Sequence, residues 1–172
     1  YYVINFRDIF RDKVIDYFKR EYLAGRTPNP CIACNRHVKF DALLKKAVSM
    51  GIDYVATGHY AIIEYDEDSR RFLLKKSVTR KKDQTYALYN LTQEQLSRTL
   101  MPIGRFSKER VREMAAEMGL NVAAKPDSQE ICFVPDNDYA GFISRNSDAD
   151  IVPGSFTDTR GNVLGEHRGI IY

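Results

Sequence analysis

Three cysteines are the residues of this sequence best suited to covalent chemistry. Cys31 and Cys34 form the sequence Cys-Ile-Ala-Cys, which follows an Asn-Pro turn and precedes an expected helix. The pair could be half of a zinc site, or two small structural residues, or could hold a reactive thiol near a helix N-terminus, where the helix dipole favours the thiolate. Candidates for further zinc ligands are Cys132, His37, His59 and His167. The spacing leaves all three interpretations open.

Cys132 lies at the end of a polar, turn-forming stretch and is followed by apolar residues. An isolated cysteine in such a position is commonly inert. A cysteine on a loop with a distant partner cysteine is, however, what sulfur relay or disulfide exchange requires. Cys34 is far from Cys132 in the sequence, so any pairing of the two depends on the fold.

The clearest charge signal is a basic segment from Ser69 to Lys82, which contains seven cations and no acid. Such a segment could be the edge of a hairpin that lysines keep soluble and unpaired. It could also be a surface that contacts phosphates and so positions a nucleic acid without reading its sequence. The residues Lys82-Asp83-Gln84-Thr85 add donors and acceptors suitable for nucleotide contacts.

Gly58 and His59 directly follow the short apolar run Tyr54-Val55-Ala56-Thr57. Gly58 is either a turn glycine or a place where a nucleotide approaches the backbone too closely for a Cβ. His59 is either a surface imidazole or a contact to a phosphate or base. Because a helix precedes the run and a glycine follows it, the order is typical of a parallel α/β sheet, whose ligands lie at the C-terminal ends of the strands.

Two helices are expected before this strand. The first has Phe10, Val14, Phe18 and Tyr22 on one face, with Asp8 as its cap and Gly25 at its end. Two prolines in Thr27-Pro28-Asn29-Pro30 then favour an extended backbone. The second helix is expected from about Lys39 to Gly51.

The rest of the chain mixes hairpins and helices. We expect a hairpin of residues 60–65 and 71–76, and a helix near residues 93–99 with a capping box of Thr92 and Gln95. A further helix is expected from Ser107 to Gly119, then a loop with a strand piece over residues 125–138. A β-rich unit is expected over residues 151–172, with a turn at residues 159–162.

The composition restricts the class of protein. With 172 residues, 44% hydrophobic and 28% charged, the chain is not disordered, collagenous or a coiled coil as a whole. No apolar run approaches the roughly 20 residues that span a bilayer. The net charge of 26 − 23 = +3 is too small to indicate nucleic-acid binding by itself, and the odd count of 3 cysteines favours a reducing compartment. Since the chain opens without Met and stops inside an apparent strand, we expect an internal fragment.

Five motifs in this order together resemble one known family. They are Gly25–Asn35 with Lys39-Phe40, Ala56–Tyr60, Lys82–Gln84, Lys125–Phe133 and Gly165–Gly169. From about Tyr2 to Tyr172 the sequence is similar to the bacterial tRNA-specific 2-thiouridylases of the MnmA (TrmU) family. The resemblance implies an α/β fold: residues 1–135 as the C-terminal part of a PP-loop (adenine nucleotide alpha hydrolase-like) parallel-sheet domain, and residues 136–172 as the start of a smaller, β-rich central domain.

The resemblance also implies an activity, the ATP-dependent replacement of O2 by sulfur in the wobble uridine of tRNA, by way of an adenylated uracil. Cys132 matches the residue that carries a persulfide. Cys34, in register with Asn35, matches the nucleophile that can form a disulfide with it. The family's N-terminal pyrophosphate loop and C-terminal β-barrel do not match any part of this sequence, so we expect the 172-residue chain by itself to be inactive.

Further site residues follow from the same resemblance. Gly58 matches a residue that contacts ATP. The resemblance implies that ATP binds together with magnesium, and that the protein holds no tightly bound metal. The expected tRNA-binding residues are Asn29, Pro30, Cys31, His59, Lys82, Asp83 and Gln84. The expected partners are tRNA and a sulfur donor such as a cysteine desulfurase or a sulfur-relay protein. The expected location is the cytoplasm, and no membrane is expected as a partner. The alternative is a non-catalytic RNA-binding module whose cysteines are structural or bind zinc.

Overall fold

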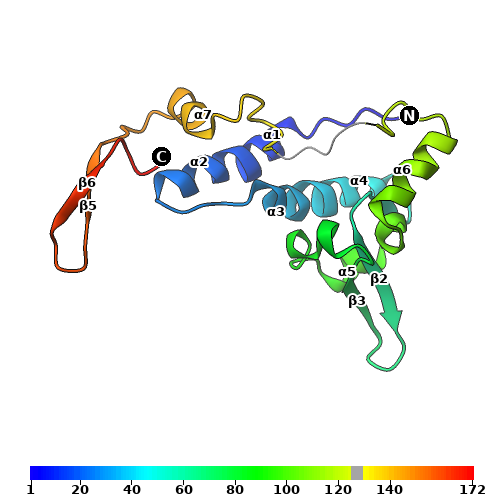
Figure 1. Ribbon diagram of the computed structural model, residues 1–172. Helices are drawn as coiled ribbons and strands as arrows, with labels where there is room; N and C mark the ends of the chain where they lie inside the picture. Colours follow the sequence, from blue (N-terminus) through cyan, green and yellow to red (C-terminus); the bar gives the residue numbers. More distant parts are fainter. Residues whose placement is uncertain (125–129) are drawn as a thin grey trace. The chain divides into compact units, whose positions relative to one another are not determined.

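The computed structural model describes residues 1–124 and 130–172, which pack as two compact units (Figure 1). Among the described residues, the first unit comprises residues 1–9 and 31–124. The second comprises residues 10–30 and 130–172. Within the described residues, no helix is both long and apolar enough to cross a membrane.

The first expected helix is present as the consecutive segments Arg7–Phe10 (α1), the π-helical Arg11–Asp16 (η1) and Tyr17–Leu23 (α2). The prediction that Asp8 caps it is wrong, because the helix begins at Arg7. The backbone N–H of Arg7 instead donates to Oδ1 of Asn5 at 2.9 Å. Gly25 follows the last turn with a φ of +72°, a left-handed conformation that glycine adopts without strain, so the predicted end is confirmed.

The second helix begins about nine residues earlier than expected, at Pro30 rather than Lys39. Its segments are Pro30–Cys34 (α3), the π-helical Asn35–Leu43 (η2) and Leu44–Ser49 (α4). A proline is tolerated in the first helical turn because its missing N–H has no intrahelical acceptor there and its φ is already helical. As a consequence, both cysteines of the Cys-Ile-Ala-Cys sequence lie in the first turns of a long helix.

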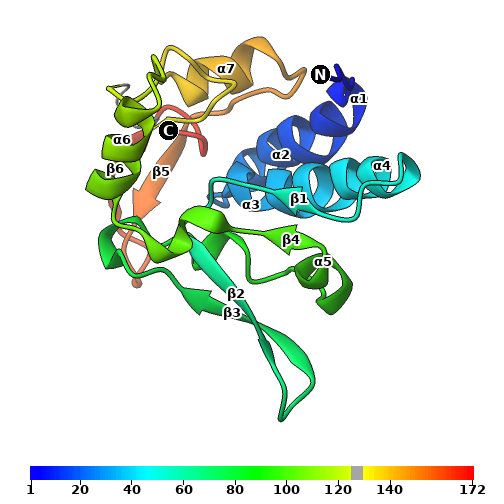
Figure 2. The same cartoon turned by 90° about the vertical axis from the view of Figure 1, so that its right-hand side faces the viewer.

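A parallel strand pair confirms the expected α/β class. Val55–Ala56 (β1) pairs with Thr99–Leu100 (β4), with Val55 opposite Thr99. Figure 2 shows β1 and β4 side by side. Since β1 follows the helix that ends at Ser49, the order of helix, strand and glycine predicted from the sequence is the one found.

The predicted hairpin is confirmed as Ala61–Asp66 (β2) paired with Arg71–Lys76 (β3). Three short 3₁₀ turns follow along the chain: Arg80–Lys82 (η3), Thr85–Ala87 (η4) and Pro102–Arg105 (η5). The core of this unit joins the second helix to the hairpin and the later turns. Its buried members are Phe40, Ala61, Leu88 and Met101.

Helix α5, Gln93–Ser97, has the predicted capping box. The backbone N–H of Thr92 donates to Oε1 of Gln95 at 2.9 Å, and that of Gln95 donates to Oγ1 of Thr92 at 3.3 Å. The expected helix after Ser107 is also present, as Lys108–Glu117 (α6), and Ser107 caps it. Its apolar face is not buried, and Met118 just beyond it is 72% exposed.

The second unit has its own core, formed by the buried residues Phe18, Ala140, Ile143 and Ile171. Helix α7, Tyr139–Arg145, was not predicted, although Oδ1 of Asp138 caps it by accepting from the N–H of Gly141 at 2.8 Å. The strand piece expected over residues 125–138 is wrong for residues 130–138, and residues 125–129 lie outside the described part of the chain. The expected β-rich unit is present as the hairpin of Gly154–Thr157 (β5) and Val163–His167 (β6).

Candidate functional site

A hollow of about 370 Å³ lies at the C-terminal end of β1, and its lining includes three of the expected site residues. It is lined by Lys39, Thr57, Gly58, His59 and Gln84. The position agrees with the rule that ligands of parallel α/β folds bind outside the carboxyl ends of the strands. Lys39 and Thr57 were not assigned to a site from the sequence. Thr57 could have been predicted as a site residue because it is next to Gly58 in the sequence. Lys39 comes from the preceding helix, and only its place in a family motif pointed to it.

His59 is a buried residue, so the interpretation as a surface imidazole is wrong. It is 7% exposed, its Nδ1 lies 2.9 Å from Oγ1 of Thr57, and its ring is tilted against Phe40 at a centroid distance of 5.7 Å. Burial, and to a smaller extent the charge of Lys39, lowers the pKa of His59 from 6.5 to about 4. The imidazole is therefore neutral near pH 7 and can act there only as a hydrogen-bonding group.

The lowered pKa of His59 predicts a loss of stability in acid. Between about pH 6.5 and pH 4 the unfolded chain binds a proton at His59 that the folded chain does not, so stability falls as the pH falls through this window. At 1.36 kcal/mol per pKa unit, we expect about 1–3 kcal/mol less stability at pH 4 than at pH 7 from this residue. Denaturant unfolding of the wild type and His59→Gln at both pH values measures it. Equal acid losses in the two proteins would contradict the assignment.

Gly58 is not required by the fold of this chain. Its φ lies outside the left-handed region, and an added Cβ would meet only Cδ1 of Ile103, at an ordinary contact distance of 3.9 Å. The conformational reason for a turn glycine is therefore absent. The open space at this backbone position is compatible with close approach of a ligand.

The side chains of Asp83 and Gln84 hold the loop that follows the hairpin. The backbone N–H of Tyr60 donates to Oε1 of Gln84, and the backbone N–H of Gln84 donates to the carbonyl of Tyr60, both at 2.9 Å. The carboxylate of Asp83 accepts from the N–H of Ser77 at 2.8 Å and from both the N–H and the hydroxyl of Thr85. These bonds fix the loop at the edge of the hollow and so position η3, which contains Lys82.

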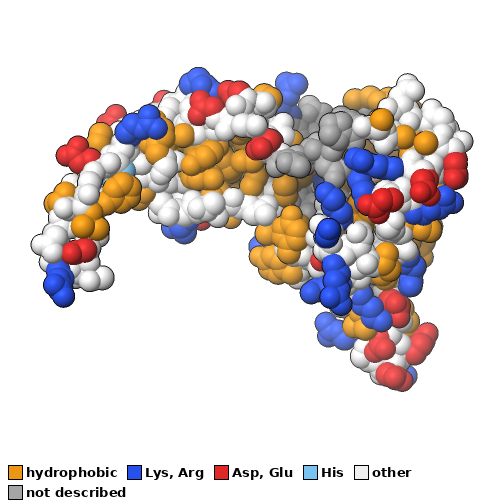
Figure 3. Space-filling model, viewed as in Figure 1, with side chains coloured by type: hydrophobic (Ala, Val, Ile, Leu, Met, Phe, Trp, Pro, Cys, Tyr) orange, Lys and Arg blue, Asp and Glu red, His pale blue; other side chains and the backbone are white. Residues whose placement is uncertain are grey.

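The basic segment is largely exposed. Figure 3 shows Lys and Arg side chains gathered on the face of the first unit that leads to the β2–β3 hairpin. Lys75 is paired with Glu64, at 2.9 Å between Nζ and Oε1, whereas Lys76 and Lys81 form no ion pair within the described residues. Both interpretations of the segment, a protected hairpin edge and a phosphate-contacting surface, are compatible with this arrangement.

The cysteines differ in their surroundings. Cys31 is exposed and Cys34 is half-buried, and both belong to the first unit, whereas the exposed Cys132 belongs to the second. None of the three forms a disulfide in the structure, and the pairing of Cys34 with Cys132 stays a prediction. Of the residues before Cys31, Asn29 is exposed and Pro30 is buried.

Asn35 was missed from the sequence and anchors the helix directly after Cys34. It is 2% exposed, and its Nδ2 donates to the carbonyl of Ala87 at 3.1 Å, while Oδ1 has no partner within the described residues. This bond ties the cysteine-bearing helix to η4, in the loop that Asp83 and Gln84 hold. Its only signal in the sequence is its place at the end of the motif Gly25–Asn35.

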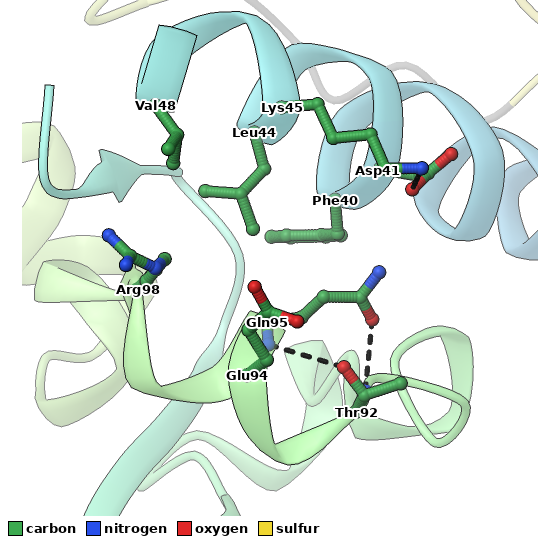
Figure 4. Close-up of a pocket in the computed structure, with 9 residues that line it drawn as sticks. All are labelled: Phe40, Asp41, Leu44, Lys45, Val48, Thr92, Glu94, Gln95 and Arg98. Carbon is green, nitrogen blue, oxygen red and sulfur yellow. Dashed lines mark hydrogen bonds and ion pairs between the residues drawn. The ribbon is translucent and has the colours of Figure 1, made fainter. Parts of the chain in front are cut away.

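Among the residues that the structure describes, no three His, Cys, Asp or Glu side chains are gathered as a metal site would need. The zinc interpretation of the Cys-Ile-Ala-Cys sequence therefore finds no further ligands there. A second hollow, of about 400 Å³, lies between the second helix and α5 (Figure 4). Phe40, Leu44 and Val48 line one side, and the ion pair of Asp41 with Lys45 lies at its rim. This hollow contains none of the expected site residues.

Residues 1–136 match the family model described as "tRNA methyl transferase HUP domain". The chain belongs to this family. The match agrees with the expected α/β domain of the PP-loop class.

Comparison with curated relatives shows which named proteins of the family the sequence is similar to. Over 172 residues, the whole of this chain, the sequence is 70% identical to the tRNA-specific 2-thiouridylase MnmA of Acetivibrio thermocellus and 66% identical to that of Clostridioides difficile. It is 63% identical to MnmA 2 of Caldanaerobacter subterraneus. The chain spans 47–48% of the length of these relatives, that is, about half. The resemblance to the MnmA family is thereby confirmed.

Proposed function

We propose that this chain is part of a tRNA-uridine 2-sulfurtransferase, which uses ATP and a cysteine persulfide to place sulfur at C2 of the wobble uridine. The observation that carries the proposal is 70% identity, along the whole chain, to a protein named as a tRNA-specific 2-thiouridylase. The hollow at the end of β1, the basic segment and the thiols are the groups that this chemistry needs. A reducing compartment such as the cytoplasm suits the three thiols.

The hollow suits an anionic nucleotide. Its lining has one cation (Lys39), a neutral imidazole (His59), an amide and a hydroxyl, but no carboxylate. Gly58 leaves the backbone open to close approach, and we assign it as a contact to ATP, which binds with magnesium as a co-substrate. ATP supplies the activation: it adenylates the uracil O2, so that this oxygen can leave with AMP.

The thiols supply the sulfur chemistry. A sulfur donor, such as a cysteine desulfurase or a relay protein, loads Cys132 with a second sulfur atom. This outer sulfur attacks C2 of the activated uracil, and AMP leaves. The thiolate of Cys34 then attacks Sγ of Cys132, which forms a Cys34–Cys132 disulfide and releases the 2-thiouridine with its electron pair on the new sulfur. A thiol reductant restores the two cysteines after each turnover.

For tRNA we propose the residues around the loop and the start of the second helix. Lys82 contacts phosphate, and the loop held by Asp83 and Gln84 presents it. His59, being neutral, contributes a hydrogen bond rather than a charge. The exposed Asn29 and Cys31 flank the buried Pro30 at the start of the cysteine-bearing helix, and we assign this Asn29–Cys31 segment to contact with the target base.

Salt dependence of tRNA binding tests the basic segment. In the full-length protein, Lys76, Lys81 and Lys82 replaced by Ala should raise Kd, and the slope of log K against log salt should become shallower by about 0.7–0.9 for each phosphate that a lysine no longer neutralises. Lys75→Ala is the matched control, because Glu64 already partly neutralises Lys75, so a smaller change is expected. An unchanged slope in the triple variant would remove this segment from the RNA site.

The nature of the product separates the candidate functions. Mass spectrometry of nucleosides from tRNA treated with the full-length protein, ATP and a sulfur donor should show oxygen replaced by sulfur in the wobble uridine. A methyl group added instead would support the reaction in the name of the family model. Tight tRNA binding with neither product would support the non-catalytic RNA-binding module.

A further inference from the structure

We infer that Cys31 is a third redox-active thiol of this site, which exchanges with Cys34 so that the disulfide formed in sulfur transfer moves from Cys34–Cys132 to Cys31–Cys34. This inference rests on the proposed function, and it adds a step that regenerates Cys132. From spacing alone, Cys31 could be a zinc ligand, a structural residue or a reactive thiol, and the family resemblance implied contact with tRNA.

The geometry of α3 brings the two thiols together. Cys31 and Cys34 are three residues apart in the α-helical segment Pro30–Cys34 (labelled in Figures 1 and 2). Residues at this spacing are neighbours on a helix surface, with Cβ atoms about 5–6 Å apart. A disulfide needs about 3.5–4.5 Å between Cβ atoms, so a small change in the first turn is sufficient.

The surroundings of the two sulfurs differ in the way that an exchange reaction needs. Cys31 is exposed and Cys34 is half-buried. The buried Asn35, bonded to the carbonyl of Ala87, fixes the backbone directly after Cys34. This bond therefore holds the helix directly after Cys34, while the exposed Cys31 lies one turn before it. A thiol in the first turn is also favoured as thiolate, because the N-terminal end of the helix dipole is positive.

The exchange is balanced in atoms and electrons. The thiolate of Cys31 attacks Sγ of Cys34; the Cys31–Cys34 bond forms, the Cys34–Cys132 bond breaks, and Cys132 leaves as a thiolate ready for the next sulfur. No electrons are gained or lost in this step. A dithiol reductant then attacks the exposed Sγ of Cys31, and Cys34 leaves as a thiolate. The reductant supplies two electrons, the same number as without Cys31.

As a consequence of the exchange, the three sulfur atoms have different roles. The external reductant acts at an exposed sulfur on the helix, while Cys132 is released for loading as soon as its product has gone. Without Cys31, the reductant must instead attack the Cys34–Cys132 disulfide itself.

A redox experiment tests the dithiol without any need for tRNA. Full-length Cys132→Ser is equilibrated with excess glutathione disulfide, quenched in acid, alkylated and mapped by mass spectrometry. We expect loss of two alkylatable thiols, a peptide that links Cys31 to Cys34, and at least tenfold less bound glutathione than in the matched control Cys31→Ser/Cys132→Ser. Equal bound glutathione in the two variants, with no linked peptide, would overturn the inference.

A second experiment follows the disulfide during turnover. Wild-type protein with a persulfide on Cys132 reacts with tRNA and ATP without reductant and is then mapped in the same way. We expect mainly the Cys31–Cys34 disulfide in the protein that has formed 2-thiouridine. A wild-type protein that forms 2-thiouridine but retains only Cys34–Cys132 refutes the exchange. Absence of 2-thiouridine refutes the proposed function, while the glutathione experiment still decides on the dithiol.

Discussion

Replacing Cys132 by Ala in the full-length protein is expected to lower 2-thiouridine formation by at least about a thousandfold, because the atom that we propose carries the sulfur is lost. Binding of tRNA should stay near that of the wild type, since phosphate contacts supply most of the affinity. Cys34→Ala should behave differently. Transfer should stop after the outer sulfur has bonded to C2, which leaves the RNA joined to Cys132 through a disulfide that added dithiothreitol releases as 2-thiouridine-containing tRNA.

The two cysteine variants control for each other. If both residues act in one sequence of steps, the double variant should be no less active than Cys132→Ala, because residues that act as a unit are not additive. The measurements are nucleoside mass spectrometry, a denaturing gel for the RNA–protein adduct, and filter binding of tRNA. Normal 2-thiouridine from Cys132→Ala would exclude a persulfide at this residue. A Cys34→Ala protein that releases its product without dithiothreitol would remove Cys34 from the release step.

The elements that could be predicted from the sequence are those whose cause is local. The capping box of Thr92 and Gln95 needs only two side chains three residues apart, and both of its hydrogen bonds are present. The β2–β3 hairpin follows from two apolar runs around a polar turn. Strand β1, which precedes Gly58, was predicted from its short apolar run between a helix and a glycine, and its parallel pairing with β4 agrees with that order.

The start of the second helix could not be placed because two opposing tendencies meet there. The prolines at positions 28 and 30 exclude a helix interior, but Pro30 fits the first turn. Helix α7 was missed for a related reason: its seven residues are too few to show a period, and packing of Ala140 and Ile143 in the core stabilises it.

Within the candidate site, the residue types could be predicted from the sequence, but their burial, protonation and hydrogen-bond partners could not. His59 suggested a contact to a phosphate or base, yet its pKa is set by burial and by Lys39, which comes from the preceding helix, twenty residues earlier in the sequence. Asp83 and Gln84 resemble nucleotide ligands in the sequence, and their side chains are bonded to the backbone of Ser77 and Tyr60. Such contacts join separate parts of the chain, so no local pattern shows them.

The second large effect is expected from Gly104→Ala, which should destabilise the protein by about 3–5 kcal/mol. Gly104 lies in η5, where it packs directly against β2. An added Cβ would overlap the carbonyl oxygen of the buried Ala61 and lie 2.6 Å from its carbonyl carbon. Backbone cannot move aside as a flexible side chain can. A shift of η5 would also weaken the bond from the N–H of Val78 to the carbonyl of Gly104, now 3.1 Å.

Gly58→Ala is the matched control for this variant, because the same methyl group meets only Ile103, at 3.9 Å. We expect its free energy of unfolding to stay within about 0.5 kcal/mol of the wild type. If Gly58 contacts ATP as proposed, Gly58→Ala should bind ATP more weakly. Gly104→Ala then changes the free energy of unfolding, and Gly58→Ala changes the affinity for ATP. Denaturant unfolding and calorimetric ATP titration of both variants measure the two effects. Unfolding of Gly104→Ala at the wild-type denaturant concentration would show that η5 does not pack on β2 as closely as described. An unchanged ATP affinity in Gly58→Ala would remove the nucleotide from the end of β1.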